Sequence, residues 1–204
     1  SLNDVIGLSV THISAYSLIL EEGTKLYELY NQNKLTIPTE DEDIFMYEEA
    51  IKILAKNGYN QYEISNFSLP GKECKHNITY WKVDEYLGFG LSSHSFFCRQ
   101  RYSNTSDINK YIDDIINGDL PIEQTEEIDE AMAFEEWIFL RLRMNEGIDV
   151  NSINENFQMN FLEKYFVQLE NLQAEGLLQY DSQRVFLTIK GFELSNYVFI
   201  TLLT

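Results

Sequence analysis

Residues whose types could do chemistry gather in the segment HNITYW, which runs from His76 to Trp81. A neutral imidazole is a normal axial ligand for haem iron, and aromatic rings supply apolar faces for a porphyrin. Tyr80 and Trp81 follow four and five residues after His76, so one helical turn would bring either ring close to the imidazole. The residue types alone favour a simpler interpretation, in which the histidine caps backbone groups in a loop and both aromatic residues anchor the core.

A zinc site is a second interpretation, because all three histidines and both cysteines lie in the first half of the chain. The pattern would pair Cys74 and His76 with His94 and Cys98. One residue between the first two ligands is fewer than the two to four that are usual for zinc, so the spacing disfavours this interpretation. The segment GFGLSS at residues 88–93 fits neither common glycine-rich phosphate motif.

The bulk composition bounds the class of protein. The chain has 204 residues, of which 44% are hydrophobic, so it can bury a substantial core. No apolar run approaches the ~20 residues that span a bilayer, and the start of the chain does not resemble an export signal. Two cysteines fit a reducing compartment, so we expect a cytoplasmic protein. The net charge of −18 argues against binding to nucleic acid, whose phosphates it would repel.

The first half of the chain predicts alternating strands and helices. Residues 10–20 predict a strand, residues 39–58 a helix with a Thr39 and Glu42 capping box, and residues 60–67 a second strand. This order predicts a parallel α/β unit. Further elements are expected along this half: a short helix at 23–33, a loop at 68–81, a strand at 85–97 and a helix at 106–118.

The second half has a different pattern. Residues 119–130 are acidic and contain Pro121, which predicts a linker between domains at 1–120 and 121–204. Three helices, a hairpin near residues 178–188 and a final helix capped by Thr188 then predict a mainly helical, winged-helix-like domain. Residues 121–204 carry five basic and fifteen acidic residues, a net charge of −10, so we expect this domain to serve in packing or protein interaction rather than in DNA binding.

Several segments resemble the haem chaperones of the HemW type, which are radical-SAM proteins related to oxygen-independent coproporphyrinogen III oxidase. The resemblance runs from about residue 10 to the end and is carried by HISAYSLILEEGTKLY, YEISNFSLPGKECKHNITYW, EYLGFGLSSHSF and LTIKGFELSNYVF. The H-N-x-x-Y-W element is the specific part. It implies that His76 is associated with haem and that Asn77, Tyr80 and Trp81 complete the motif. Ser68 and Lys75 depart from the residues usual in the family.

The resemblance implies a fold and cofactors. The fold would be α/β, the C-terminal portion of a radical-SAM partial TIM-type barrel followed by the winged-helix-like domain. Family members use S-adenosylmethionine and a [4Fe–4S] cluster held by a C-x-x-x-C-x-x-C motif. This chain lacks that motif, so we expect no cluster in it. By analogy with the oxidase, Ile19 and His94 would face the S-adenosylmethionine region.

The resemblance also implies partners, which are haem and the proteins that accept it, including a membrane-associated acceptor. A homodimer through an exposed strand edge at residues 10–20 is a further expectation. Two alternatives are open. The chain could be part of an oxygen-independent coproporphyrinogen III oxidase of porphyrin biosynthesis, against which the H-N-x-x-Y-W element argues. It could also be a protein-interaction module built on residues 121–204.

Overall fold

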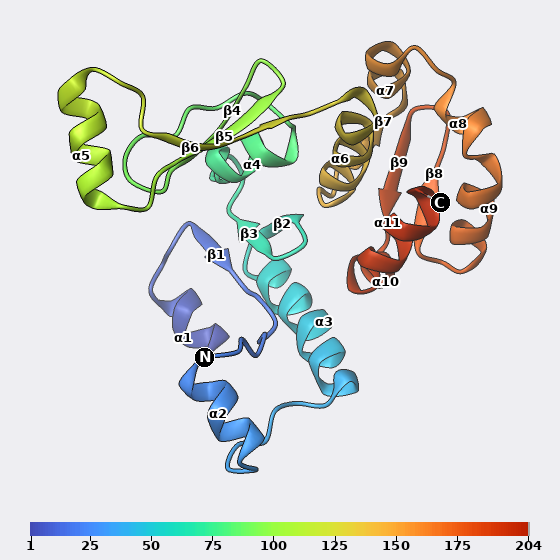
Figure 1. The fold of residues 1–204 in the computed structure, drawn as a ribbon. Coiled ribbons are helices and arrows are strands. Elements are labelled where there is room, and N and C mark those ends of the chain that lie inside the picture. Colours follow the sequence, from blue (N-terminus) through green and yellow to red (C-terminus); the bar gives the residue numbers. More distant parts are fainter. Residues whose placement is uncertain (204) are drawn as a thin grey trace.

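The computed structural model describes residues 1–203, and these form three parts, each built around one three-stranded sheet (Figure 1). Every hydrogen-bonded pair of strands in these sheets is antiparallel. The chain is therefore a mixed α and β protein, as the sequence predicted, with short strands and many helices.

The first part contains strands in the order β1-β3-β2 and three helices. Its elements are α1 (Leu2–Gly7), β1 (His12–Ser14), α2 (Lys25–Asn31), α3 (Glu40–Lys56), β2 (Asn60–Glu63) and β3 (Asn66–Ser68). Strands β1 and β2 both run antiparallel to β3 and so share one direction. The predicted parallel α/β unit is therefore wrong in the strand pairing. The segment expected to be one strand at 60–67 divides into β2 and β3, and β3 turns back and lies between β1 and β2.

Two expected elements of this part have different outcomes. The capping box of α3 is confirmed, since the Thr39 hydroxyl accepts a hydrogen bond from the Glu42 amide at 3.3 Å and the Glu42 carboxylate accepts one from the Thr39 amide at 2.8 Å. The expected strand at 10–20 is wrong beyond Ser14. Residues 15–20 are not in a strand, and Tyr16, Leu18 and Ile19 are exposed.

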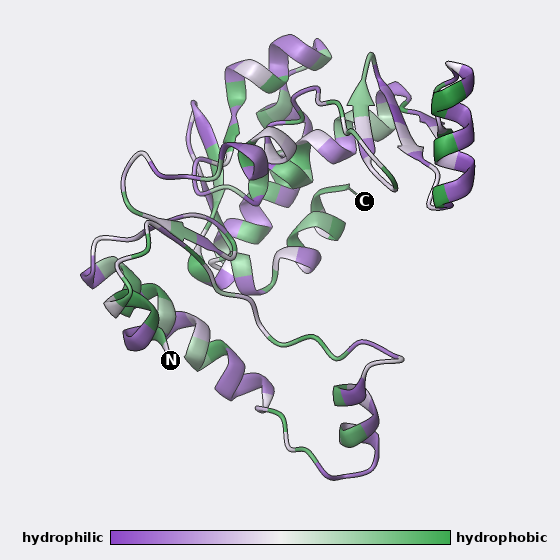
Figure 2. Ribbon diagram, turned by 90° about the vertical axis from the view of Figure 1, so that its left-hand side faces the viewer, coloured by the Kyte–Doolittle hydropathy of each residue, from purple (hydrophilic) through white to green (hydrophobic). Residues whose placement is uncertain are grey.

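The second part contains the sheet β4-β5-β6 and two helices. Its elements are α4 (Lys75–Trp81), β4 (His94–Phe97), β5 (Gln100–Asn104), α5 (Ile108–Asn117) and β6 (Ile122–Glu127). The expected linker at 119–130 is wrong over β6, which pairs with β5 from Asn104 to Gln100. Figure 2 shows hydrophobic and hydrophilic residues alternating along α5, whose four isoleucines are exposed.

The third part surrounds the sheet β7-β9-β8 with six helices, counted within residues 1–203. Its elements are α6 (Glu130–Leu142), β7 (Ile148–Asp149), α7 (Val150–Phe157), α8 (Phe161–Lys164), α9 (Phe166–Ala174), β8 (Leu178–Tyr180), β9 (Arg184–Leu187), α10 (Ile189–Glu193) and α11 (Ser195–Leu203). The hairpin and the Thr188 cap are confirmed. The third expected helix is interrupted at Tyr165, and the last one at Leu194.

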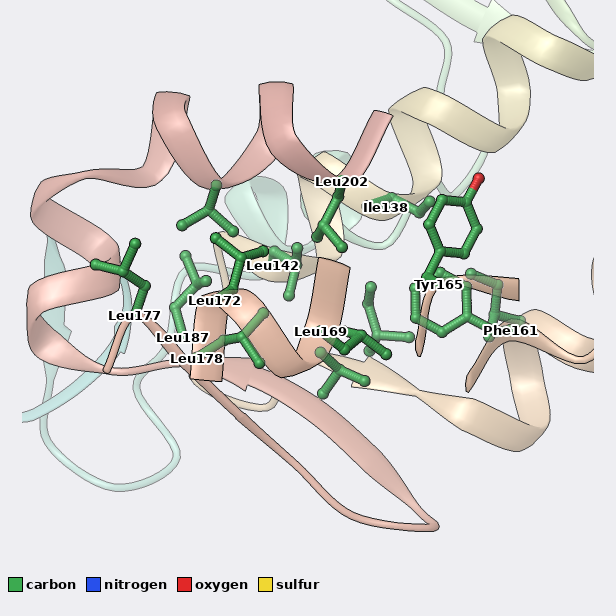
Figure 3. Close-up of a cluster of buried hydrophobic side chains, with 14 of the residues drawn as sticks. Ile138, Leu142, Phe161, Tyr165, Leu169, Leu172, Leu177, Leu178, Leu187 and Leu202 are labelled. Carbon is green, nitrogen blue, oxygen red and sulfur yellow. The ribbon is translucent and has the colours of Figure 1, made fainter. Parts of the chain in front are cut away.

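The larger of two hydrophobic clusters fills the third part. Its buried side chains come from α6, α9, the hairpin and α11, and ten are labelled in Figure 3. Leucines from opposite sides meet there, with Leu142, Leu169 and Leu202 all fully buried. The smaller cluster joins β1, α3 and β3 around Leu54 and Phe67.

Backbone hydrogen bonds connect the first and third parts. The Ile64 amide donates to the Arg143 carbonyl at 3.1 Å, and the Asn145 amide donates to the Tyr62 carbonyl at 3.1 Å. The Asn145 side chain adds a 2.7 Å bond to the Gln61 carbonyl. The residues after α6 therefore satisfy the edge of β2 that would otherwise face solvent.

No helix within residues 1–203 is long and apolar enough to cross a membrane.

Candidate functional site

The segment that carries the H-N-x-x-Y-W element forms the helix α4, so the loop expected at 68–81 is wrong over residues 75–81. The chain enters α4 at Cys74, whose carbonyl accepts a 3.1 Å hydrogen bond from the Ile78 amide. The Thr79 hydroxyl donates to the Lys75 carbonyl at 3.0 Å. The helix lies beside α6, with which it is in contact (Figure 1). Because four residues make about one helical turn, residues 76 and 80 lie on the same face of α4.

His76 and Tyr80 are in contact, as the spacing predicted. Their ring centroids are 4.7 Å apart with an interplanar angle of 85°, and Tyr80 meets Tyr86 in the same edge-to-face way at 4.6 Å and 78°. The imidazole is exposed, and neither of its nitrogens forms a hydrogen bond within residues 1–203. Both nitrogens are therefore free to bind a ligand, and the aromatic rings line one side of the imidazole.

Trp81 does not join that row of rings. The Arg143 guanidinium lies over its indole ring, 4.6 Å from the centroid, and the indole N–H is buried without a partner within residues 1–203. One residue later, the Lys82 carbonyl accepts a 3.1 Å hydrogen bond from Arg141. Trp81 therefore holds the end of α4 against α6, which is a structural contribution to the site.

Asn77 faces a tyrosine of β2 rather than the imidazole. The Tyr62 hydroxyl is bonded to His12 Nε2 at 2.8 Å. Burial raises the pKa of Tyr62 above its ordinary value, while hydrogen bonds from the Cys74 backbone and the Asn77 side chain act in the opposite direction. Asn77 therefore lies near Tyr62 of the first sheet.

A buried polar cluster supports this sheet next to Tyr62. Glu63 is 1% exposed, and its carboxylate accepts hydrogen bonds from the Ser65 amide at 2.9 Å and from the Asn66 side chain. Asn66 also accepts a hydrogen bond from the Ser14 hydroxyl of β1. These bonds satisfy a carboxylate that would be costly to bury alone, and they fix β1 against β3.

Sequence reasoning missed four residues around α4, which are His12, Tyr62, Tyr86 and Arg143. Only Tyr86, five residues past Trp81, carried a local signal as an aromatic residue close to the motif. The other three come from distant segments, so no spacing along the chain indicates them.

The residues expected near S-adenosylmethionine lie in different parts of the fold. Ile19 is 78% exposed in the segment after β1, and His94 is the exposed first residue of β4. The backbone at His94 lies close to Gly88, where an added Cβ would overlap the His94 carbonyl oxygen. A glycine is therefore needed at that position for the two segments to approach.

The cysteines do not fit an iron–sulfur cluster. Cys74 caps α4 and Cys98 follows β4, and both are free thiols. No group of three or more histidine, cysteine or acidic side chains within residues 1–203 could hold a metal ion. Residues 1–203 therefore offer neither the three thiolates of the cluster motif nor the tetrahedral set considered for zinc.

Comparison with known proteins gives matches over the whole chain. Residues 128–194 match the HemN C-terminal domain family. The chain is 40% identical over 195 residues to the haem chaperone HemW of Lactococcus lactis, covering 94% of this chain and 50% of that protein. It is 34% identical to HemW of Bacillus subtilis, covering 98% of this chain and 52% of that protein.

A solved structure confirms the likeness at the level of the fold. The radical SAM enzyme HemN of Escherichia coli, a coproporphyrinogen III oxidase, matches all of this chain and 50% of its own, with a TM-score of 0.71 and 17% identity. The chain spans about half the length of the curated relatives it matches. By these similarities, residues 128–194 belong to the HemN C-terminal domain family, and the chain as a whole is similar to haem chaperones of the HemW type.

Proposed function

We propose that this chain is part of a haem chaperone and that it contributes the haem-binding helix α4. The observation that carries the proposal is His76, an exposed imidazole with both nitrogens unbonded at the end of a row of aromatic rings. Relatives that match 94% and 98% of the chain are named haem chaperones, which supports the same conclusion. Haem is here the cargo, to be handed to an acceptor protein.

The roles of the motif residues follow from their contacts. A neutral His76 would coordinate the iron, and Tyr80, with Tyr86 behind it, would offer an apolar side to the porphyrin. Trp81 and Asn77 would act as positioning residues, because Trp81 packs against Arg143 and Asn77 lies near Tyr62. An exposed iron ligand suits a protein that must release its cargo, since a fully enclosed haem would leave slowly.

Spectroscopic titration of haem against the chain tests this proposal. The His76→Ala variant should weaken binding by at least about tenfold and shift the Soret band, because metal sites lose affinity on this scale even when only a supporting residue is removed. The His94→Ala variant removes another exposed histidine and is the matched control. Cys74→Ala removes the competing ligand two residues away and should change the spectrum less.

An unchanged Soret band in a folded His76→Ala variant would remove this residue from the site. A loss of binding in His94→Ala alone would move the ligand to β4. Both results can be measured without knowing which protein accepts the haem.

The finer architecture is also proposed. Residues 1–120 would be a piece of a radical-SAM partial barrel and residues 121–204 a winged-helix-like domain. The order α6, β7, α7, α8 with α9, β8, β9 and the sheet order β7-β9-β8 support the second assignment. The pairing of β6 with β5 favours a boundary nearer Ile128 than residue 120. Ile19 and His94, both exposed, would face S-adenosylmethionine.

The remaining expectations concern partners and location. We propose a cytoplasmic chaperone that delivers haem to acceptor proteins, a membrane-associated one among them, and does not bind nucleic acid. A homodimer through the edge of β1 stays a prediction. The oxidase alternative would be favoured if the chain, completed to the length of its relatives, converted coproporphyrinogen. The alternative of a simple interaction module would be favoured if residues 121–204 bound a protein while α4 bound no haem.

A further inference from the structure

A cavity of about 340 Å³ lies at the junction of α4, the second sheet and α6 with α7. Three of its lining residues are basic, Lys82, Arg99 and Arg141. Its apolar lining includes Phe96, Trp137 and Phe157. A volume of this size is typical of pockets for small organic ligands.

The charge of the cavity is opposite to that of the chain as a whole, whose net charge is −18. Two acidic residues, Asp84 and Glu136, also line it. Glu136 is already neutralised, because both of its oxygens accept hydrogen bonds from Arg101 at 2.9 and 3.0 Å. Counted with Asp84, the three basic residues leave the lining with a positive charge.

The three basic residues have no acidic partner of their own. Neither Lys82, Arg99 nor Arg141 forms an ion pair within residues 1–203, whereas Arg101 pairs with both Glu126 and Glu136. Positive charges that face a cavity without a counterion attract an anion more strongly there than on open surface, because water screens them less.

Arg141 combines partial burial, an aromatic contact and an unpaired nitrogen. It is half-buried, its guanidinium lies 4.9 Å from the centre of the Trp137 ring, and one nitrogen donates to the Lys82 carbonyl at 3.1 Å. Its Nε is buried without a partner within residues 1–203. Burial lowers the pKa of Arg141, while the nearby carboxylates, Asp84 first among them, act in the opposite direction. A stacked arginine with a spare donor is well suited to bind a carboxylate.

We propose that this cavity binds a small organic anion, with a carboxylate held by Arg141, Lys82 and Arg99 and a flat apolar body against Phe96, Phe157 and Trp137. The ligand class follows from the lining, since a bare inorganic anion would leave the aromatic wall uncovered and a neutral ring would leave the basic residues unpaired. His76 does not line this cavity, and the proposal does not depend on haem binding.

Calorimetric titration of the chain with naphthoate tests the proposal, with naphthalenemethanol as the neutral analogue and acetate as the anion without a ring. Naphthoate should bind at least about tenfold more tightly than either, because both parts of the ligand are needed. Arg141→Gln should weaken naphthoate binding by about tenfold or more. Arg184→Gln removes the same charge from an exposed position outside the cavity and should leave binding within about twofold.

A second variant controls for a loss of binding caused by misfolding. Arg99→Gln changes an exposed side chain that forms no ion pair within residues 1–203, so the fold should be retained while affinity falls. In NMR spectra of the chain, the indole N–H of Trp137 should shift on addition of naphthoate and that shift should be lost in Arg141→Gln. Equal affinity for the neutral analogue, full affinity in both arginine variants, or no binding at millimolar naphthoate would each overturn the proposal.

Discussion

Tyr62 and Trp81 each contact a residue far away in the sequence. The Tyr62 hydroxyl is bonded to His12, and Trp81 lies under Arg143. His76 and Tyr80 could be paired from the sequence because four residues make one helical turn. The contacts of Tyr62 and Trp81 could not, because they depend on how β2 and α6 pack, which no local spacing encodes.

The Tyr62→Phe variant tests how much that hydroxyl stabilises the fold. Loss of its hydrogen bond should lower the free energy of unfolding by about 1 kcal/mol, because His12 Nε2 then has no partner. Urea denaturation measures the change. Tyr111→Phe is the matched control, since the Tyr111 hydroxyl forms no hydrogen bond within residues 1–203. Equal effects of the two variants would contradict a specific role for Tyr62.

At the level of elements, the sequence predicted those whose ends carry a chemical marker. The capping box at Thr39 marked the start of α3, and the cap at Thr188 marked the start of α10. The elements it missed lack such markers. Strand β6 is acidic and nearly all exposed, so its pattern resembles a linker, and only its pairing with β5 makes it a strand.

The N-cap of α7 gives a prediction about pH. The Asp149 carboxylate accepts a 2.7 Å hydrogen bond from the Ser152 amide, and hydrogen bonds from Ser152 hold the pKa of Asp149 below its usual 3.8. A lowered pKa in the folded state means that the carboxylate stabilises the fold above 3.8 and that this contribution is lost as the pH falls through the folded-state value. Asp149→Ala should cost about 1 kcal/mol at neutral pH.

Asp149→Asn is the control for the charge. Asparagine keeps the capping oxygen but does not titrate, so the advantage of the native chain over this variant should shrink between about pH 5 and about pH 2. Thermal unfolding followed by circular dichroism at several pH values measures it. A constant difference over that range would show that the pKa of Asp149 is the same in the folded and unfolded states.

On the scale of the whole molecule, hydrogen bonds join the three parts in addition to the covalent chain. Residues 143–145 bond to the edge of β2, and Arg141 bonds to the carbonyl that follows α4. The prediction of a linker near residue 120 did not anticipate these contacts. It rested on acidic composition and Pro121, which are local signals and carry no information about hydrogen bonds between distant backbone segments.

These bonds predict a single unfolding transition. Calorimetry of the chain should give one heat peak, with calorimetric and van't Hoff enthalpies in agreement. Asn145→Ala removes the bond to the Gln61 carbonyl and should lower stability by about 1 kcal/mol. Asn171→Ala, on the exposed face of α9, should change stability by no more than about 0.5 kcal/mol. Two resolved heat peaks in the native chain would show that the parts unfold independently.

The arginines over Trp81 and Trp137 have one more consequence. The sequence contains two tryptophans, and each lies under a guanidinium where α4 meets α6. Intrinsic fluorescence excited through indole therefore comes from this junction and carries almost no signal from α1, α2 or α5. The tryptophan emission of this protein should therefore change when α4 separates from α6.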